Sequence, residues 1–165
     1  MFVKYNLMPN DSRVWIYQSN REFKAEELGV LNNKIQDFID SWKRHGDDLK
    51  ASYVIKYNQF IVLLVDKCYN DVSGCSIDAS VNLIQQLENH FEIDLTNKLN
   101  ISFKDNANIN IVSLSDFQNY AKQDKITSNT VVFNNLVTTK KEFENNWEVT
   151  ADKSWHKRFL ITDNY

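Results

Sequence analysis

The chain has 165 residues, a length that fits one ordinary domain with a hydrophobic core of useful size. Hydrophobic residues make up 42% of it and charged residues 25%, a composition that argues against intrinsic disorder. The net charge of -3 and the lack of a long Lys and Arg run argue against nucleic-acid binding.

Nothing in the sequence predicts insertion into a membrane. The longest uninterrupted apolar run, residues 60–65, is far shorter than the roughly 20 residues that cross a bilayer. The first residues, MFVKYNLMPNDSR, lack the apolar core of a signal peptide. We therefore expect a cytoplasmic protein, in which Cys68 and Cys75, the only two cysteines, are free thiols.

Strand and helix patterns follow one another along the first hundred residues. Residues 13–18, RVWIYQ, alternate as a strand does, and residues 26–45 carry apolar side chains at helical spacing, with Gly46 as a helix stop. Two strands follow, ASYVIKY and QFIVLLVD, joined by a turn at Asn58 and Gln59. Because FIVLLV is apolar on both faces, we expect that strand to be buried on both sides.

A second helix is predicted from about residue 77 to residue 91, and ISF at residues 101–103 is a further strand. The order strand, helix, strand, strand, helix, strand is that of the split βαβ, or ferredoxin-like, arrangement. We therefore expect an α+β fold in a single domain, with a ferredoxin-like core over residues 13–104. Residues 105–165 would form a C-terminal α/β extension.

That extension has weaker patterns. NINIVS is predicted to form a hairpin with ISFKD across DNAN, and TVVF is a candidate strand. Ser115 with Gln118 forms a capping box that would open a short helix, and Thr139 with Glu142 opens another that runs to about Trp147.

Two polar turns are predicted to form one site. We expect the first and third strands of the core to be central and parallel, so that QSNR, residues 18–21, and SGCSID, residues 73–78, face each other. Helix N-termini bind anions and stabilise thiolates, which favours a small anionic ligand at this place. The residues expected to bind it are Gln18, Ser19, Asn20, Arg21, Gly74, Ser76 and Asp78.

Three residues are candidates for catalysis at the same site. With Ser76 as N-cap, Cys75 would lie just before the first helical turn, where its pKa falls below the usual value of about 8.5. Asp66 could orient Arg21 or act as a base, and His156 in SWHKRF could be the base for Cys75. The alternative is that SGCSID is only a glycine turn, a serine cap and a buried cysteine, and that SWHKRF is a docked tail.

No cofactor or metal is expected. The sequence has neither GxxxxGK[ST] nor GxGxxG, so it lacks a phosphate-binding glycine loop. His and Cys residues do not have the spacing of metal ligands, and HExxH and DxDxDG are absent.

Four stretches, RVWIYQSNR, SGCSID, TVVFNNLV and SWHKRF, together resemble a small family of uncharacterised bacterial proteins often labelled "ABC transporter ATPase". The resemblance covers nearly the whole chain and implies a shared fold and a cytoplasmic location, with no established activity. The label does not fit a sequence without a P-loop. A shorter stretch, SLSDFQNYAKQDKITSNTVVF, looks like the helix, turn and strand of GYF-like peptide-binding modules.

Two functions remain open at this stage. The first is binding of a small anionic ligand between the two turns, with or without thiol chemistry at Cys75, which leaves open whether the protein is an enzyme. The second is a non-catalytic module that holds a protein or peptide partner, or a second copy in a homodimer, with its C-terminal half or an exposed sheet edge.

Overall fold

The computed structural model describes residues 1–67 and 74–160, except the side chain of Cys75. Four α-helices and three β-sheets within these residues confirm the α+β class. The chain divides into two compact units, residues 1–96 with 138–141 and residues 97–137 with 142–165.

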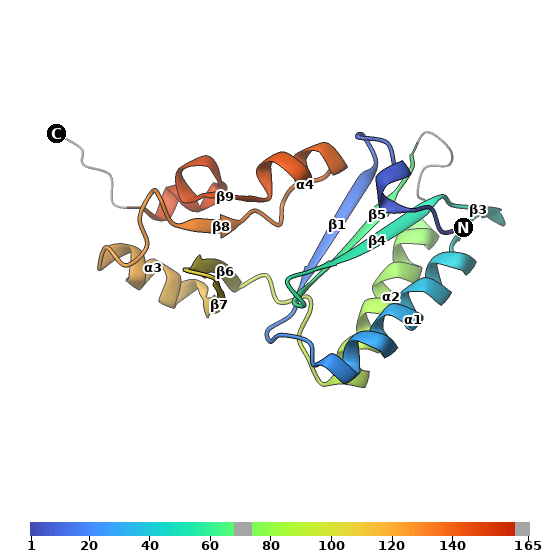
Figure 1. Ribbon diagram of the computed structural model, residues 1–165, viewed down its shortest axis with the longest axis horizontal. Coiled ribbons are helices and arrows are strands. Elements are labelled where there is room, and N and C mark those ends of the chain that lie inside the picture. The colour runs from blue at the N-terminus through green and yellow to red at the C-terminus, as the bar shows by residue number, and fades with distance from the viewer. Residues whose placement is uncertain (68–73, 161–165) are drawn as a thin grey trace. The chain divides into compact units, whose positions relative to one another are not determined.

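The first unit contains a three-stranded sheet and two long helices (Figure 1). Its elements are η1 (Tyr5–Leu7), β1 (Arg13–Gln18), α1 (Ala25–Ser41), β2 (Lys43–Arg44), β3 (Asp47–Asp48), β4 (Ala51–Lys56), β5 (Phe60–Val65) and α2 (Gly74–Phe91). The strand order is β1-β5-β4, and both outer strands run antiparallel to β5. The two helices lie side by side on one face of this sheet.

The core of this unit follows from the two periodicities of its sequence. Leu31, Ile35 and Ile39 recur every fourth residue on α1 and are fully buried. They pack with alternate residues of β5 and with the inner side of α2 in one cluster. All six residues of β5 are inaccessible to solvent, so the predicted burial of FIVLLV on both faces is confirmed.

The first helix begins at a local hydrogen bond and ends where a short hairpin begins. The Glu27 carboxylate accepts the N–H of Lys24 at 2.8 Å, as in a capping box. The helix ends at Ser41, earlier than predicted, because residues 43–48 form the β2–β3 hairpin. Gly46, expected as the helix stop, is instead a turn residue of this hairpin with φ +86°.

Two expectations about the sheet are wrong. The first and third strands are antiparallel, since Arg13 pairs with Val65 and Gln18 with Phe60. The strand at residues 101–103 does not join this sheet but becomes β6 (Asn100–Asp105) of the second unit. Only the second difference departs from a ferredoxin-like core, in which the first and third strands are antiparallel neighbours. Because the described sheet lacks the fourth strand, a complete core is not confirmed.

The hairpin between β4 and β5 forms, although its loop has three residues instead of the expected two. Lys56 pairs with Phe60 across the loop, in which Tyr57 and Asn58 have φ values of 54° and 51°. Positive φ is sterically accessible to Asn, but uncommon for a bulky residue such as Tyr.

The second unit is built on a four-stranded antiparallel sheet of order β7-β6-β8-β9. Its further elements are β7 (Asn108–Ser113), α3 (Leu114–Lys122), β8 (Val131–Phe133), most of α4 (Lys140–Asn146), β9 (Glu148–Thr150), η2 (Ala151–Lys153) and η3 (Trp155–Phe159). Phe117 of α3 packs with Ile101 and Val132 in a buried cluster. The rings of Phe143 and Trp147 pack with Phe133 in a second apolar group.

The predicted hairpin of NINIVS with ISFKD is confirmed. Asp105 pairs with Asn108, so the loop has two residues, and Asn106 has φ 55°. The helix that follows begins earlier than predicted, because the side chain of Ser113, not Ser115, accepts the N–H of Asp116 at 3.1 Å.

Candidate functional site

The QSNR turn leads from β1 into α1 and lies against the end of α2. The Nη2 of Arg21 donates to the carbonyl of Phe91, the last residue of α2, at 2.9 Å. Asn20 and Asp94 exchange two hydrogen bonds: the Asn20 N–H donates to the Asp94 carbonyl, and the Asp94 N–H to Asn20 Oδ1. The turn therefore holds the C-terminal end of α2.

Most N–H groups of the Arg21 guanidinium donate hydrogen bonds within the protein. Its Nη1 and Nη2 donate to the two carboxylate oxygens of Glu27 at 2.8 and 2.9 Å, and Nη1 also donates to the Glu22 carbonyl. The hydrogen bond to Arg21 is the main reason that the pKa of Glu27 falls to about 2. A cation at the end of α2 satisfies free carbonyl groups and the helix dipole, which is a structural role.

Two other predicted ligands of this turn, Gln18 and Ser19, are held by contacts with β5 and the loop before it. Ser19 is fully buried, and its N–H and carbonyl bond to the carbonyl and side chain of Gln59. Gln18 is the last residue of β1 and pairs with Phe60.

The described part of the SGCSID turn is the first turn of α2. Gly74 starts the helix with a φ outside the positive region, and an added Cβ would have no atom of the described residues within 4 Å, so nothing here supports the predicted special role of this glycine. Ser76 lies inside the helix and is not its N-cap. Its hydroxyl donates to the Lys43 carbonyl at 2.7 Å, and its own carbonyl accepts the indole N–H of Trp42 at 2.9 Å. Asp78 is exposed.

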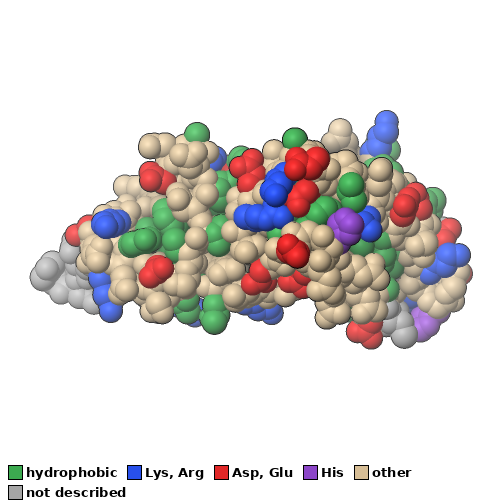
Figure 2. All heavy atoms as spheres, turned by 90° about the horizontal axis from the view of Figure 1, so that it is seen from below, with side chains coloured by type: hydrophobic (Ala, Val, Ile, Leu, Met, Phe, Trp, Pro, Cys, Tyr) green, Lys and Arg blue, Asp and Glu red, His purple; other side chains and the backbone are tan. Residues whose placement is uncertain are grey.

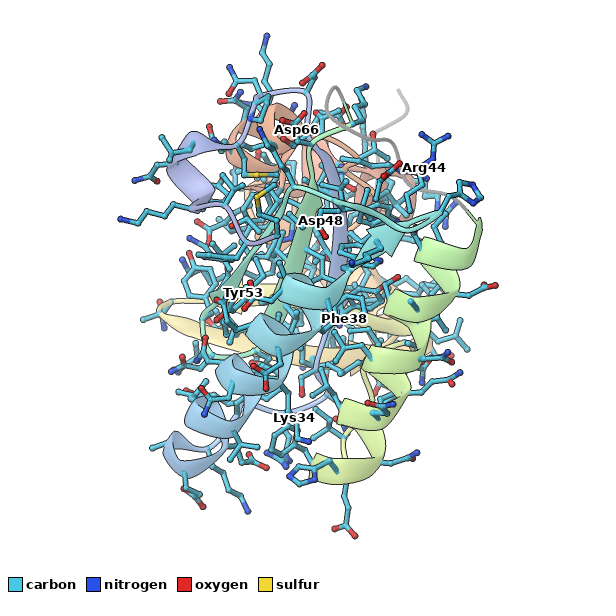
Figure 3. All side chains as sticks on the ribbon, turned by 90° about the vertical axis from the view of Figure 1, so that its right-hand side faces the viewer. Lys34, Phe38, Arg44, Asp48, Tyr53 and Asp66 are labelled. Atoms are coloured by element: carbon cyan, nitrogen blue, oxygen red, sulfur yellow. The ribbon has the colours of Figure 1, made fainter. Side chains whose placement is uncertain are left out.

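The expected meeting of the two turns does not occur. Since β1 and β5 are antiparallel, residues 18–21 lie where β5 begins, and Asp66 follows the other end of β5, about 20 Å away along the strand. The same two turns lie at opposite ends of α2, whose 18 residues span about 25 Å. In Figure 3, Asp66 lies at the upper end of the sheet.

Asp66 is consequently not the partner that orients Arg21, which binds Glu27. Asp66 is half-buried, and its backbone N–H donates to the Lys50 carbonyl at 2.9 Å. The thiol of Cys75 lies outside the described residues, so its reactivity stays a prediction.

His156 is a fully buried member of the second unit. Its Nδ1 lies 2.7 Å from the Ser154 hydroxyl, and its ring stacks on Trp155 with centroids 3.8 Å apart and lies 5.4 Å from the ring of Phe117. Burial, helped by the nearby charge of Arg158, lowers the pKa of His156 to about 4. The imidazole is therefore neutral at pH 7, and its buried Nε2 has no hydrogen-bond partner in the described structure.

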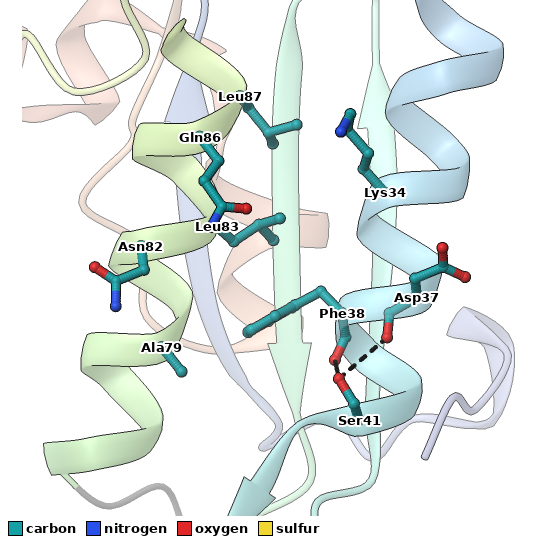
Figure 4. Close-up of a pocket in the computed structure, with 9 residues that line it drawn as sticks. All are labelled: Lys34, Asp37, Phe38, Ser41, Ala79, Asn82, Leu83, Gln86 and Leu87. Carbon is teal, nitrogen blue, oxygen red and sulfur yellow. Dashed lines mark hydrogen bonds between the residues drawn. The ribbon is translucent and has the colours of Figure 1, made fainter. Parts of the chain in front are cut away.

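A groove of about 470 Å³ runs between α1 and α2 (Figure 4). Its floor is apolar, and Phe38 and Leu83 point into it from opposite helices. Its rim carries Lys34 and Asp37, charges of opposite sign one helical turn apart, so the groove does not favour an ion of either sign.

The second unit has a more distinctive surface, the outer edge of β7. This strand ends its sheet, and no described strand pairs with that edge. Its sequence, NINIVS, contains no charged residue and no proline, the devices by which proteins usually protect a free edge. Ile109 and Ile111 are partly exposed.

The other edges are shorter or partly covered. β4 is bridged by Phe2 at Ala51, and β1 by Thr139 at Arg13. β9 has only three residues and carries Glu148. Sequence reasoning found the β6–β7 hairpin but not its importance, because the position of β7 at the edge depends on which strand pairs with β6 on the other side.

The surface in Figure 2 carries acidic and basic side chains side by side on one face.

Within residues 1–67 and 74–160, no three His, Cys, Asp or Glu side chains are grouped to hold a metal ion. None of the helices described is both long and apolar enough to cross a membrane.

Comparison of the chain with protein-family models, with curated proteins and with solved structures found no match. The resemblance to the bacterial family and to GYF-like modules thus stays a prediction.

Proposed function

We propose that this protein is a non-catalytic interaction module that binds an extended segment of a partner along the outer edge of β7. The observation that carries the proposal is that β7 is a six-residue edge strand with neither a charged residue nor a proline. Strand addition at such an edge joins partners through main-chain hydrogen bonds, while alternate side chains give specificity.

The direction of the backbone groups supports this proposal. Hydrogen-bonded and non-hydrogen-bonded pairs alternate along an antiparallel ladder. The pair Asp105 and Asn108 closes a two-residue loop and is therefore hydrogen-bonded, as is Asn110 with Phe103. Ile109 and Ile111 then direct their N–H and C=O groups outward, where a partner strand would bind.

The side chains beside these groups fit the same use. Ile109 and Ile111 lie on one face, opposite Lys104 and Ser102 of β6. A partner strand would cover more of these two apolar side chains and favour binding through the burial of apolar surface. Asn108, Asn110 and Val112 lie on the other face, where Val112 packs against the buried cluster of the second unit.

The test is selection of displayed random peptides on the native protein, followed by comparison with Ile111→Pro and Ile111→Thr. Proline removes the outward N–H without removing a ladder hydrogen bond, whereas threonine keeps the N–H and changes the side chain. We expect selected peptides to lose at least tenfold in affinity for the proline variant and much less for the threonine variant. Equal affinity for all three proteins, or no selected peptide, would overturn the proposal.

The finer classification of the first unit is also a proposal. Three antiparallel strands in the order first, third, second, with two helices on one face, fit a ferredoxin-like arrangement without its fourth strand. We also propose a cytoplasmic location with Cys68 and Cys75 as free thiols, which measured thiol content after gentle isolation would test.

A further inference from the structure

We propose that the strand that occupies this edge is β7 of a second copy of the chain. The inference rests on the proposed function, since it assumes that the β7 edge is the binding surface. The two β7 strands would run antiparallel, with Ile109 opposite Ile111 of the other copy and Asn110 opposite itself.

The backbone restricts the register. Only residues with outward N–H and C=O groups can form the hydrogen-bonded pairs of a new ladder, and in β7 these are Ile109, Ile111 and Ser113. Pairing Ile109 of each copy with Ile111 of the other uses all their outward groups in four hydrogen bonds. The two strands then meet around a twofold axis, as in an isologous dimer.

The end of the strand excludes the register shifted by two residues, in which Ile111 would face Ile111 and Ile109 would face Ser113 of the other copy. Ser113 also directs its backbone groups outward, but it is the N-cap of α3, and the carbonyl of an N-cap residue accepts the first intrahelical hydrogen bond, so it is not free to join a second ladder. The free length is thus residues 108–112, whose centre is Asn110.

The side chains in this register are self-complementary. Asn110 faces its copy in a non-hydrogen-bonded pair, where Cα atoms are only about 4.5 Å apart and the two amides can donate to and accept from each other. On the opposite face, each Ile109 lies beside Ile111 of the other copy. Since β7 has no charged side chain, no like charges meet across the axis.

A single strand pair buries little surface compared with a standard interface, so we expect a weak dimer with a Kd on the order of 10 µM. Sedimentation equilibrium from 1 to 500 µM should therefore show a monomer–dimer equilibrium in the wild type. Amide exchange at Ile109 and Ile111 should slow as the concentration rises.

Asn110→Asp is the decisive variant, because it sets two carboxylates against each other at the axis. We expect its Kd at pH 7.5 to rise at least tenfold, and to recover at pH 4.5, where one carboxyl of the facing pair is protonated. Asn106→Asp is the matched control: it adds the same charge in the two-residue loop, outside the paired strand, so its effect should be clearly smaller.

Two outcomes would overturn the inference. A wild type that is monomeric up to 500 µM would exclude the second copy, and selected peptides that still depend on Ile111 would show that the proposed function nevertheless holds. A dimer that Asn110→Asp and Ile111→Pro both leave intact would place the contact elsewhere. Circular dichroism of each variant at both pH values checks that the fold is kept.

Discussion

The Arg21 guanidinium donates two hydrogen bonds to the Glu27 carboxylate, with Nη1 2.8 Å from Oε1 and Nη2 2.9 Å from Oε2. The same Nη2 reaches the carbonyl of Phe91, 70 residues further along the chain. One side chain thus joins the start of α1 to the end of α2. This finding changes the meaning of QSNR from a ligand-binding turn to a structural clamp.

Arg21→Gln should lower the free energy of unfolding by about 1–2 kcal/mol, because it removes charge-assisted hydrogen bonds to Glu27 and Phe91. Urea unfolding followed by tryptophan fluorescence measures the loss. Lys34→Gln is the control, since it removes an exposed cation of α1 that forms no ion pair within the described part of the chain, and should change stability by less than about 0.5 kcal/mol. Equal losses for the two variants would contradict the clamp.

Glu27 should make the stability of the wild type fall in acid. Its pKa is about 2 in the folded protein and near 4.5 in the unfolded chain. The stabilisation is therefore complete above pH 4.5 and is lost as the pH falls toward 2. Between pH 5 and pH 2.5, unfolding free energies should fall more steeply for the wild type than for Glu27→Gln, and parallel curves would refute the assignment.

His156 should add a pH dependence in a higher range. Its pKa is about 4 when folded, against the usual 6.5, so the unfolded chain binds a proton that the folded one excludes. Stability is then greatest above pH 6.5 and falls as the pH drops to 4, by up to about 3 kcal/mol. His156→Phe, which keeps a ring beside Trp155 and Phe117, should flatten this part of the curve. An unchanged slope would mean that the buried imidazole is not responsible.

The elements of this fold were predictable where the signal is local. The helical spacing of Leu31, Ile35 and Ile39 and the apolar run of β5 depend only on nearby residues, and both predictions were confirmed. The turn Asp105 to Asn108 is equally local and was found.

Strand pairing was not predictable in the same way, because it depends on residues far apart in the sequence. β5 lies between β1 and β4, antiparallel to both, whereas we expected β1 and β5 to run parallel. The helix between β1 and β4 makes those two strands parallel, and the hairpin then reverses β5. That single change of direction separates QSNR from SGCSID. The role of Ser76 was hidden for a related reason, since it requires Trp42 and Lys43 from the end of α1 to lie beside the start of α2.

Glycine to alanine should have opposite effects at two places in the first unit. Gly29 lies within α1 with nothing within 4 Å of an added Cβ, so Gly29→Ala should stabilise the protein by about 0.5–1 kcal/mol through better helix propensity. Gly46 also has free space, but its φ is +86°, which an L side chain rarely adopts. Gly46→Ala should therefore destabilise by about 1 kcal/mol. Thermal unfolding of both variants measures the signs, and a stabilising Gly46→Ala would mean that the β2–β3 turn can adopt another conformation at little cost.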